Sequence, residues 1–86
     1  MAIYNIQWKS SAIKELRKLS KKDIPFLIEA IEQLGTNPRP PQVKKIAGAS
    51  YTYRIRVRDY RIIYSIEDTI LLIEIIRIGH RKDVYR

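Results

Sequence analysis

Three segments rich in β-branched residues fill the last third of the chain and restrict the folds that it can adopt. They cover Tyr51–Val57, Arg61–Ile66 and Ile70–Ile78, and only three residues separate each segment from the next. Gaps of this length predict tight turns, and hence a meander of antiparallel strands. The last segment is apolar on both faces, which is typical of a strand that has neighbours on both sides.

The first 35 residues predict one further strand and two helices. Ile3–Trp8 alternates in the manner of a strand, and the apolar residues after it recur at the spacing of amphipathic helices. We expect Ser10 and Ser11 to cap the first helix. Pro25 should lie in the first turn of the second helix, and Gly35 should end it. Because so few residues join the two helices, they should pack as an antiparallel hairpin against the sheet.

The predicted order is β-α-α-β-β-β, an α+β fold with a helical hairpin on a mainly antiparallel sheet. A chain of 86 residues is long enough for one core, so residues 1–86 are expected to form a single domain. Thr36–Ser50 is the only long segment without a strand or helix pattern, and its three prolines exclude a helix. This segment is either a functional loop or a connector that crosses the surface.

The net charge of +8 is concentrated in the second half of the chain. Residues 1–36 hold six Lys and Arg against four Asp and Glu, whereas residues 37–86 hold eleven against five. Arg54, Arg56 and Arg58 alternate with apolar residues, so a strand here would carry three cations in a row on one face. Such a row repels itself, and it indicates a surface that meets a polyanion such as nucleic acid, or an acidic protein.

Composition also excludes several classes of protein. The chain has no cysteine, so it can form neither disulfides nor thiolate metal sites. The N-terminus is too short and too polar to be a signal peptide, and the longest nearly apolar run, Ile70–Ile78, is too short to span a bilayer. We therefore expect a soluble, cytoplasmic protein that has no contact with a membrane.

Three stretches carry a resemblance to a known family. They are Tyr53-Arg-Ile-Arg-Val57, Asp59-Tyr-Arg-Ile-Ile-Tyr64 and Ile78-Gly-His-Arg-Lys-Asp-Val-Tyr85. With the early helix pair, they resemble the RelE/ParE superfamily of bacterial and archaeal toxins over essentially the whole chain. The Gly-His-Arg…Val-Tyr ending is more similar to the RelE branch than to the ParE branch. One departure is Arg58, which replaces the glycine that usually precedes Asp-Tyr-Arg.

The resemblance implies the toxin of a type II toxin–antitoxin pair that cuts mRNA in the vacant A site of the ribosome. Its implied partners are the ribosome with its mRNA and an acidic antitoxin, with which it can form a higher assembly. No metal or other cofactor is implied. The 2′-hydroxyl of one nucleotide attacks the adjacent phosphate, which requires a base, an acid and cations around the phosphorane.

The resemblance also implies roles for individual residues. The candidates for catalysis are Arg61, His80, Arg81 and Tyr85, and those for RNA binding are Lys44, Lys45, Arg54, Arg56 and Arg58. Arginine suits the phosphate because it is permanently charged and can grip two oxygens at once. His80 exchanges protons near neutral pH. It could be the base, with Tyr85 or a water as the acid, or the reverse.

Other interpretations remain open at this point. A ParE-like inhibitor of DNA gyrase would share the fold without cutting RNA, and a catalytically silent homologue would only bind its antitoxin or RNA. Individual residues have structural alternatives as well. Arg54 and Arg56 could form a solvated strand face, and Arg61 could hold a turn by pairing with an aspartate. His80 could be structural, and Tyr85 could close one end of the core.

Overall fold

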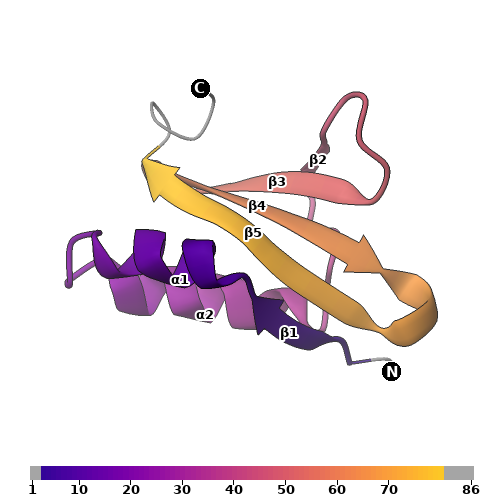
Figure 1. The fold of residues 1–86 in the computed structure, drawn as a ribbon, viewed down its shortest axis with the longest axis horizontal. Coiled ribbons are helices and arrows are strands. Elements are labelled where there is room, and N and C mark those ends of the chain that lie inside the picture. The colour runs from indigo at the N-terminus through magenta and orange to yellow at the C-terminus, as the bar shows by residue number, and fades with distance from the viewer. Residues whose placement is uncertain (1–2, 81–86) are drawn as a thin grey trace.

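Five strands form one sheet in the order β1-β5-β4-β3-β2, and two helices lie beside each other on one of its faces (Figure 1). The computed structural model describes residues 3–80. The elements are β1 (Asn5–Trp8), α1 (Ser10–Arg17), α2 (Ile24–Leu34), β2 (Lys44–Lys45), β3 (Thr52–Val57), β4 (Tyr60–Glu67), the 3-10 turn η1 (Asp68–Ile70) and β5 (Leu72–His80). The α+β class and the element order predicted from the sequence are confirmed.

The core lies between the helices and the sheet, because both helices turn an apolar stripe toward the same face of the strands. The buried residues come from α1, α2, β3, β4 and β5: Ala12, Leu27, Ile31, Leu34, Ile55, Ile62, Tyr64, Ile66, Ile73, Ile75 and Ile78. The opposite face carries no helix (Figure 1). We call it the open face.

Strand β5 lies between β1 and β4, as its two apolar faces predict. It pairs in parallel with β1 and antiparallel with β4. It begins at Leu72 rather than Ile70, because residues 68–70 form η1 and Leu71 adopts a left-handed backbone with φ of 51°. The segment predicted to be irregular contains the short strand β2, whose two residues pair with Arg54 and Tyr53 of β3. The sheet therefore gains an edge strand that apolar alternation did not reveal.

The helix ends agree with the sequence in part. Pro25 lies in the first turn of α2, as predicted. Ser10 is instead the first residue of α1, whose N-cap is Lys9 without a side-chain cap bond, so the predicted serine caps are wrong. Gly35 caps α2 with an ordinary right-handed φ of −61°. Glycine fits there because a Cβ would lie 3.2 Å from the Tyr4 carbonyl oxygen, while the Tyr4 N–H donates to the Gly35 carbonyl at 2.8 Å.

A β-bulge in β5 changes which face its side chains take. Tyr64 pairs with Ile75, whereas Ile63 pairs with Arg77, so Ile76 is an extra residue in β5. Such a residue reverses the alternation of every side chain that follows it. Ile75 and Ile78 are consequently both buried.

Among the helices of residues 3–80, none has the length and apolar character that crossing a membrane requires.

Candidate nucleic-acid interface

Four cations from three strands gather on the open face. Strand register pairs Lys44 with Arg54 and Arg56 with Arg61, and cross-strand partners project to the same side of a sheet. Their neighbours Ile55 and Ile62 are buried beneath the helices, so the cations point the other way. We call Lys44, Arg54, Arg56 and Arg61 the open-face cluster. With Gln42 and Ile55, they line a groove of about 330 Å³.

The groove is electropositive, because none of the six described residues that line it is acidic. Like charges at this density lower the affinity for cations and raise that for phosphates. Arg56 is exposed, and its Nε donates to the Arg58 carbonyl oxygen at 3.1 Å. Arg61 is half-buried, and its Nε is shielded from solvent. The arrangement can hold a chain of phosphates along the sheet.

Two of the residues predicted to bind RNA lie elsewhere. Arg58 belongs to the β3–β4 turn, with φ of 56°, and its guanidinium lies over the Phe26 ring at 3.8 Å from the centroid. It therefore does not extend the row of Arg54 and Arg56, as the alternation suggested, because the strand ends at Val57. Lys45 pairs with Tyr53 and so projects to the side opposite Lys44.

The structure does not bring Arg61 and His80 together. Arg61 pairs with Gly79, whereas His80 pairs with Tyr60 and so projects to the helix-covered side. The His80 ring meets the Tyr60 ring edge-on, with centroids 6.1 Å apart. The two candidates for catalysis that the structure describes thus lie on opposite faces of the sheet. Arg81 and Tyr85 lie outside the described residues.

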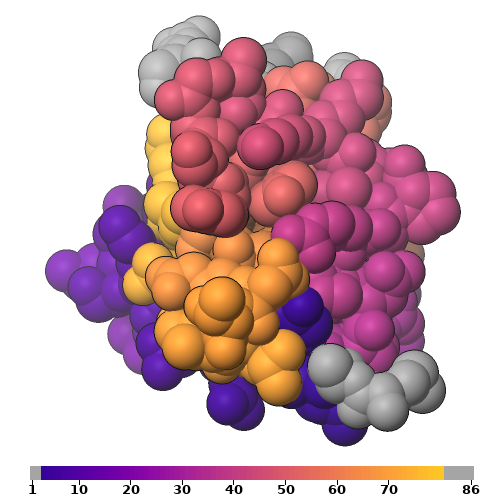
Figure 2. Space-filling model, turned by 90° about the vertical axis from the view of Figure 1, so that its right-hand side faces the viewer, coloured from indigo at the N-terminus to yellow at the C-terminus, as the bar shows by residue number. Residues whose placement is uncertain are grey.

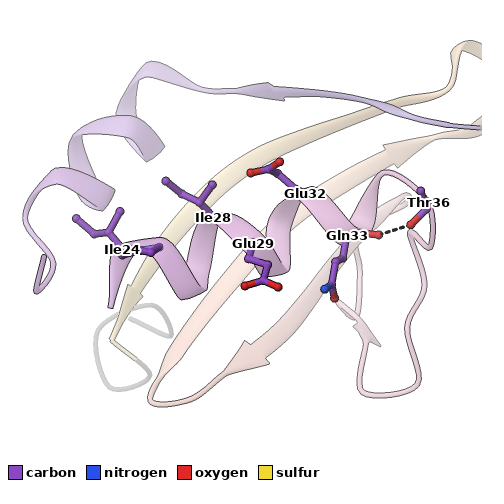
Figure 3. A pocket seen from close by; sticks show the side chains of 7 residues that line it. Ile24, Ile28, Glu29, Glu32, Gln33 and Thr36 are labelled. Atoms are coloured by element: carbon purple, nitrogen blue, oxygen red, sulfur yellow. Dashed lines mark hydrogen bonds between the residues drawn. The ribbon is translucent and has the colours of Figure 1, made fainter. Parts of the chain in front are cut away.

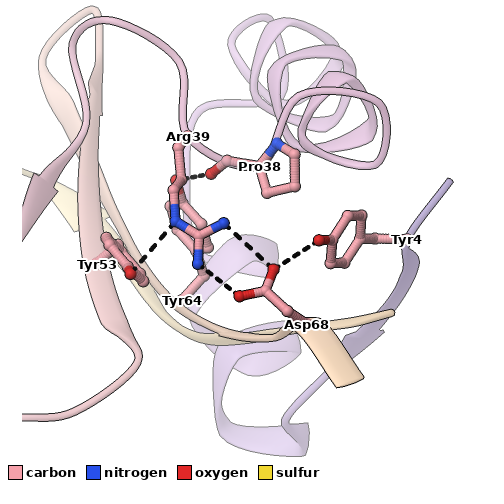
Figure 4. Close-up of polar contacts among 6 residues, drawn as sticks. All are labelled: Tyr4, Pro38, Arg39, Tyr53, Tyr64 and Asp68. Carbon is pink, nitrogen blue, oxygen red and sulfur yellow. Dashed lines mark hydrogen bonds and ion pairs between the residues drawn. The ribbon is translucent and has the colours of Figure 1, made fainter. Parts of the chain in front are cut away.

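A polar network around Arg39 holds the loop after α2 against the far end of the sheet (Figure 4). Arg39 donates to both Asp68 carboxylate oxygens, at 3.2 and 2.8 Å, and the Tyr4 hydroxyl donates to Asp68 at 2.6 Å. The buried Tyr64 hydroxyl donates to the Pro38 carbonyl at 2.7 Å. Figure 2 shows the segment containing Arg39 (magenta) beside the η1 end of the sheet (orange). Sequence reasoning missed this network, because Tyr4, Arg39 and Asp68 lie far apart in the chain and no local pattern links them.

Electrostatics in the network follow from these contacts. The Arg39 guanidinium and then the Tyr4 hydroxyl hold the pKa of Asp68 below its usual range by hydrogen bonding to its charged form. Burial raises the pKa of Tyr64. Both groups therefore keep, at neutral pH, the protonation state that their contacts require.

Another groove, of about 610 Å³, follows the outer side of α2 (Figure 3). Ile24 and Ile28 line it together with Glu29 and Glu32. This acidic rim differs in sign from the open-face cluster, so the groove is a poor site for RNA. Within residues 3–80, no group of three or more His, Asp or Glu side chains is placed to hold a metal ion.

Comparison with known proteins gives consistent matches. A family profile described as the ParE toxin of the type II toxin–antitoxin system parDE matches residues 6–85. The chain is 30% identical to Toxin RelG of Mycobacterium tuberculosis, over 96% of this chain and 97% of that protein. It is 28% identical to a putative toxin RelE1 of Methanocaldococcus jannaschii, over 96% of each chain.

The fold is also similar to that of solved structures. In the archaeal RelE–RelB complex from Pyrococcus horikoshii, a chain 28% identical in sequence superposes with a TM-score of 0.82, over 94% of this chain and 98% of that one. The isolated Escherichia coli RelE toxin, 27% identical, superposes with a TM-score of 0.78, over 98% of this chain and 92% of that one.

Proposed function

We propose that this chain, which belongs to the RelE/ParE family of type II toxins, is a ribosome-dependent, metal-independent endonuclease that cuts mRNA in the A site. The observation that carries the proposal is the open-face cluster. Four cations line one groove whose described lining contains no carboxylate, and this charge pattern fits a phosphate backbone.

The proposed reaction is a transfer within the RNA. The 2′-oxygen of one nucleotide loses its proton to a base and bonds to the adjacent phosphorus. The bond from phosphorus to the 5′-oxygen breaks, and that oxygen takes a proton, leaving a cyclic phosphate and a free 5′-hydroxyl. Negative charge builds up on the phosphorane oxygens, where fixed guanidinium groups stabilise it.

Arg54, Arg56 and Arg61 supply charge in this scheme and exchange no protons, because arginine stays charged throughout the physiological pH range. Following the resemblance, we assign Arg81 to the scissile phosphate beside Arg61, and Tyr85 to the base or to the 2′-hydroxyl. His80 takes part in proton transfer only if the RNA reaches around the end of the sheet, because it lies on the face opposite to Arg61.

We propose an antitoxin as the partner of this toxin in the cytoplasm, and a higher assembly of the two. A relative from Pyrococcus horikoshii was crystallised as a RelE–RelB complex. An acidic segment would relieve the repulsion within the open-face cluster. Within residues 3–80, the edge strand β2 pairs in register with only two of the six residues of β3, which leaves part of that edge for an added strand.

The test adds purified protein to a translation complex stalled with an empty A site and maps the mRNA ends by primer extension. Wild type, Arg61→Ala, Arg56→Ala and Arg81→Ala are compared with Arg17→Ala, which removes an exposed cation on α1. We expect new ends within the A-site codon. Loss of Arg61 should slow cutting roughly 100-fold, as loss of one group that stabilises developing charge does. Arg17→Ala should cut at the wild-type rate.

If folded wild-type protein leaves the mRNA intact, the proposed nuclease activity is wrong. That result would favour the alternative, a ParE-like inhibitor of DNA gyrase. The observation behind that alternative is the family profile, whose description names ParE. A supercoiling assay with purified gyrase separates the two, since a gyrase inhibitor blocks supercoiling and leaves mRNA whole. A silent homologue would do neither.

A further inference from the structure

A second hollow lies at the β3–β4 turn, on the helix-covered side of the sheet. It measures about 440 Å³ and is lined by three rings, those of Phe26, Tyr60 and His80, together with four charged side chains. We call it the turn pocket. It draws residues from α2, β4 and the last position of β5, so the tertiary fold alone assembles it.

Contacts among the lining residues orient the three rings. The Arg58 guanidinium lies 3.8 Å over the Phe26 centroid, and the Arg58 side chain is exposed. The Tyr60 hydroxyl donates to an Asp23 carboxylate oxygen at 2.7 Å, and the His80 ring is edge-on to Tyr60. Phe26 is 46% exposed, which is a large apolar area for a ring at the mouth of a hollow.

The turn pocket and the open-face cluster differ in charge. The pocket's four charged side chains, Lys22, Arg58, Asp23 and Asp59, sum to zero, and three rings accompany them. The groove over the open-face cluster has four cations and no described acid. A balanced, ring-lined pocket suits a flat and uncharged group, whereas the cationic groove suits phosphates.

The two sites lie back to back at one end of the sheet. Tyr60 and Arg61 are consecutive residues of β4 that project to opposite faces, one into the turn pocket and one into the groove. Arg56 of the groove is joined to Arg58 of the pocket by the hydrogen bond from its Nε to the Arg58 carbonyl oxygen. Cations thus continue around the turn from one face to the other.

We infer that the turn pocket binds one unstacked nucleobase of the RNA strand whose phosphates lie along the open-face cluster. Single-stranded bases stack on aromatic rings and on guanidinium planes, and Phe26, His80 and Arg58 offer both. The Asp23 and Asp59 carboxylates are acceptors for an exocyclic amine, which favours adenine or cytosine over uracil. The inference rests on the proposed function, because it takes RNA as the polyanion on the open face.

The experiment compares two fluorescent probes of equal length and charge, an oligoadenylate and an abasic ribose-phosphate chain, by polarisation. Wild type should bind the oligoadenylate about 10-fold more tightly, the cost of one lost stack. Phe26→Ala should remove most of this preference and leave the salt slope unchanged, because no phosphate contact is lost. The matched control is Ile28→Ala, an exposed apolar residue of the same helix outside the pocket.

Four further variants separate the roles of the two sites. Arg54→Ala should weaken both probes alike and lower the salt slope by about one. His80→Phe should keep the preference for oligoadenylate, whereas His80→Ala should reduce it. Stacking on this side of the pocket depends on an aromatic ring and not on the exchange of a proton. Arg58→Gly should also reduce the preference for oligoadenylate, because it removes the guanidinium plane, in a turn whose backbone suits glycine.

The outcomes distinguish failure of the inference from failure of the proposed function. One outcome is that wild type binds both probes equally, that Phe26→Ala and Arg58→Gly change the affinity for neither probe, and that Arg54→Ala weakens the binding of both. The open-face cluster would then bind RNA as proposed, and the nucleobase pocket would be wrong. If wild type binds neither probe at low salt, the RNA surface itself is wrong, and the inference is overturned with it.

Discussion

Arg39 donates two hydrogen bonds to the Asp68 carboxylate, although the two residues are 29 positions apart in the chain. The pair joins the segment after α2 to the turn before β5, and Tyr4 adds a third bond from the N-terminal side. A bidentate guanidinium–carboxylate contact fixes orientation as well as distance. This pair holds the segment after α2 at the η1 end of β4, which is the end away from the β3–β4 turn.

Acid should weaken this end of the molecule through Asp68. Its pKa is lower in the folded protein than in the unfolded chain, so the pair stabilises the fold fully above about pH 4 and loses this effect as the pH falls through the folded value. We expect Asp68→Asn to be less stable than wild type at pH 7, with the gap narrowing as the pH falls below about 4. Thermal unfolding across this range measures it, with Glu67→Gln as the neighbouring control. A constant gap at all pH values would contradict the assignment.

Glu15 should stabilise the fold more through its hydrogen bond from the Ile78 backbone N–H than through its ion pair with Arg77. It accepts the Ile78 N–H at 3.1 Å, beyond the point where β1 stops covering β5, and it pairs with the part-exposed Arg77 at 3.3 Å. Glu15→Ala leaves the N–H without this acceptor and should cost about 1–2 kcal/mol of unfolding free energy. Glu15→Gln retains an acceptor oxygen and should cost well under half of that, because an exposed pair contributes little. Urea unfolding of both variants measures the difference, and equal losses would show that the charge dominates.

Arg58 carries opposing effects on stability. Its left-handed backbone favours glycine by about 1 kcal/mol, while its guanidinium stabilises the turn through Phe26. In a Phe26→Ala background only the backbone effect remains, so Arg58→Gly should raise the unfolding free energy there by about 1 kcal/mol. The gain should be smaller in the wild-type background. A double-mutant cycle by chemical denaturation gives both values, and equal gains would mean that the Phe26 contact has no energetic weight.

Tyr64→Phe tests the buried hydroxyl at the centre of the sheet. The Tyr64 side chain is fully buried and donates to the Pro38 carbonyl at 2.7 Å. Removing the hydroxyl should cost about 1–2 kcal/mol, because the carbonyl loses its partner inside the protein. Tyr51→Phe, at a residue 62% exposed, should have almost no effect. The denaturant midpoints of the two variants measure this difference in stability. Similar midpoints would contradict a stabilising role for the Tyr64 hydroxyl.

Much of the fold follows from local pattern. The alternation of Tyr53, Ile55 and Val57 and the helical spacing around Leu27 and Ile31 reflect which side chains must leave water, and this requirement acts on every element separately. Strand β2 had no such signal. Lys44 and Lys45 are exposed, and they pair with β3 only because the loop is returned to it by the rest of the fold.

Local sequence pattern likewise predicted only part of the candidate site. Charge and strand period together predicted that Arg54 and Arg56 share one face, and Arg61 joins them because the two-residue turn sets the register of β4 against β3. The Arg39–Asp68 pair and the turn pocket bring together residues that are distant in the chain. No local pattern marks them.

The sequence by itself determined every element of the sheet and the helix pair except β2, and the cationic face, since these depend on the periodicity of single segments. Only the tertiary structure decided on which face His80 lies. The segment from Ile70 to Ile78 is apolar at both parities, so alternation could not reveal the extra residue at Ile76. That bulge reverses the faces of all later side chains, and it turns His80 away from Arg61 and toward Tyr60.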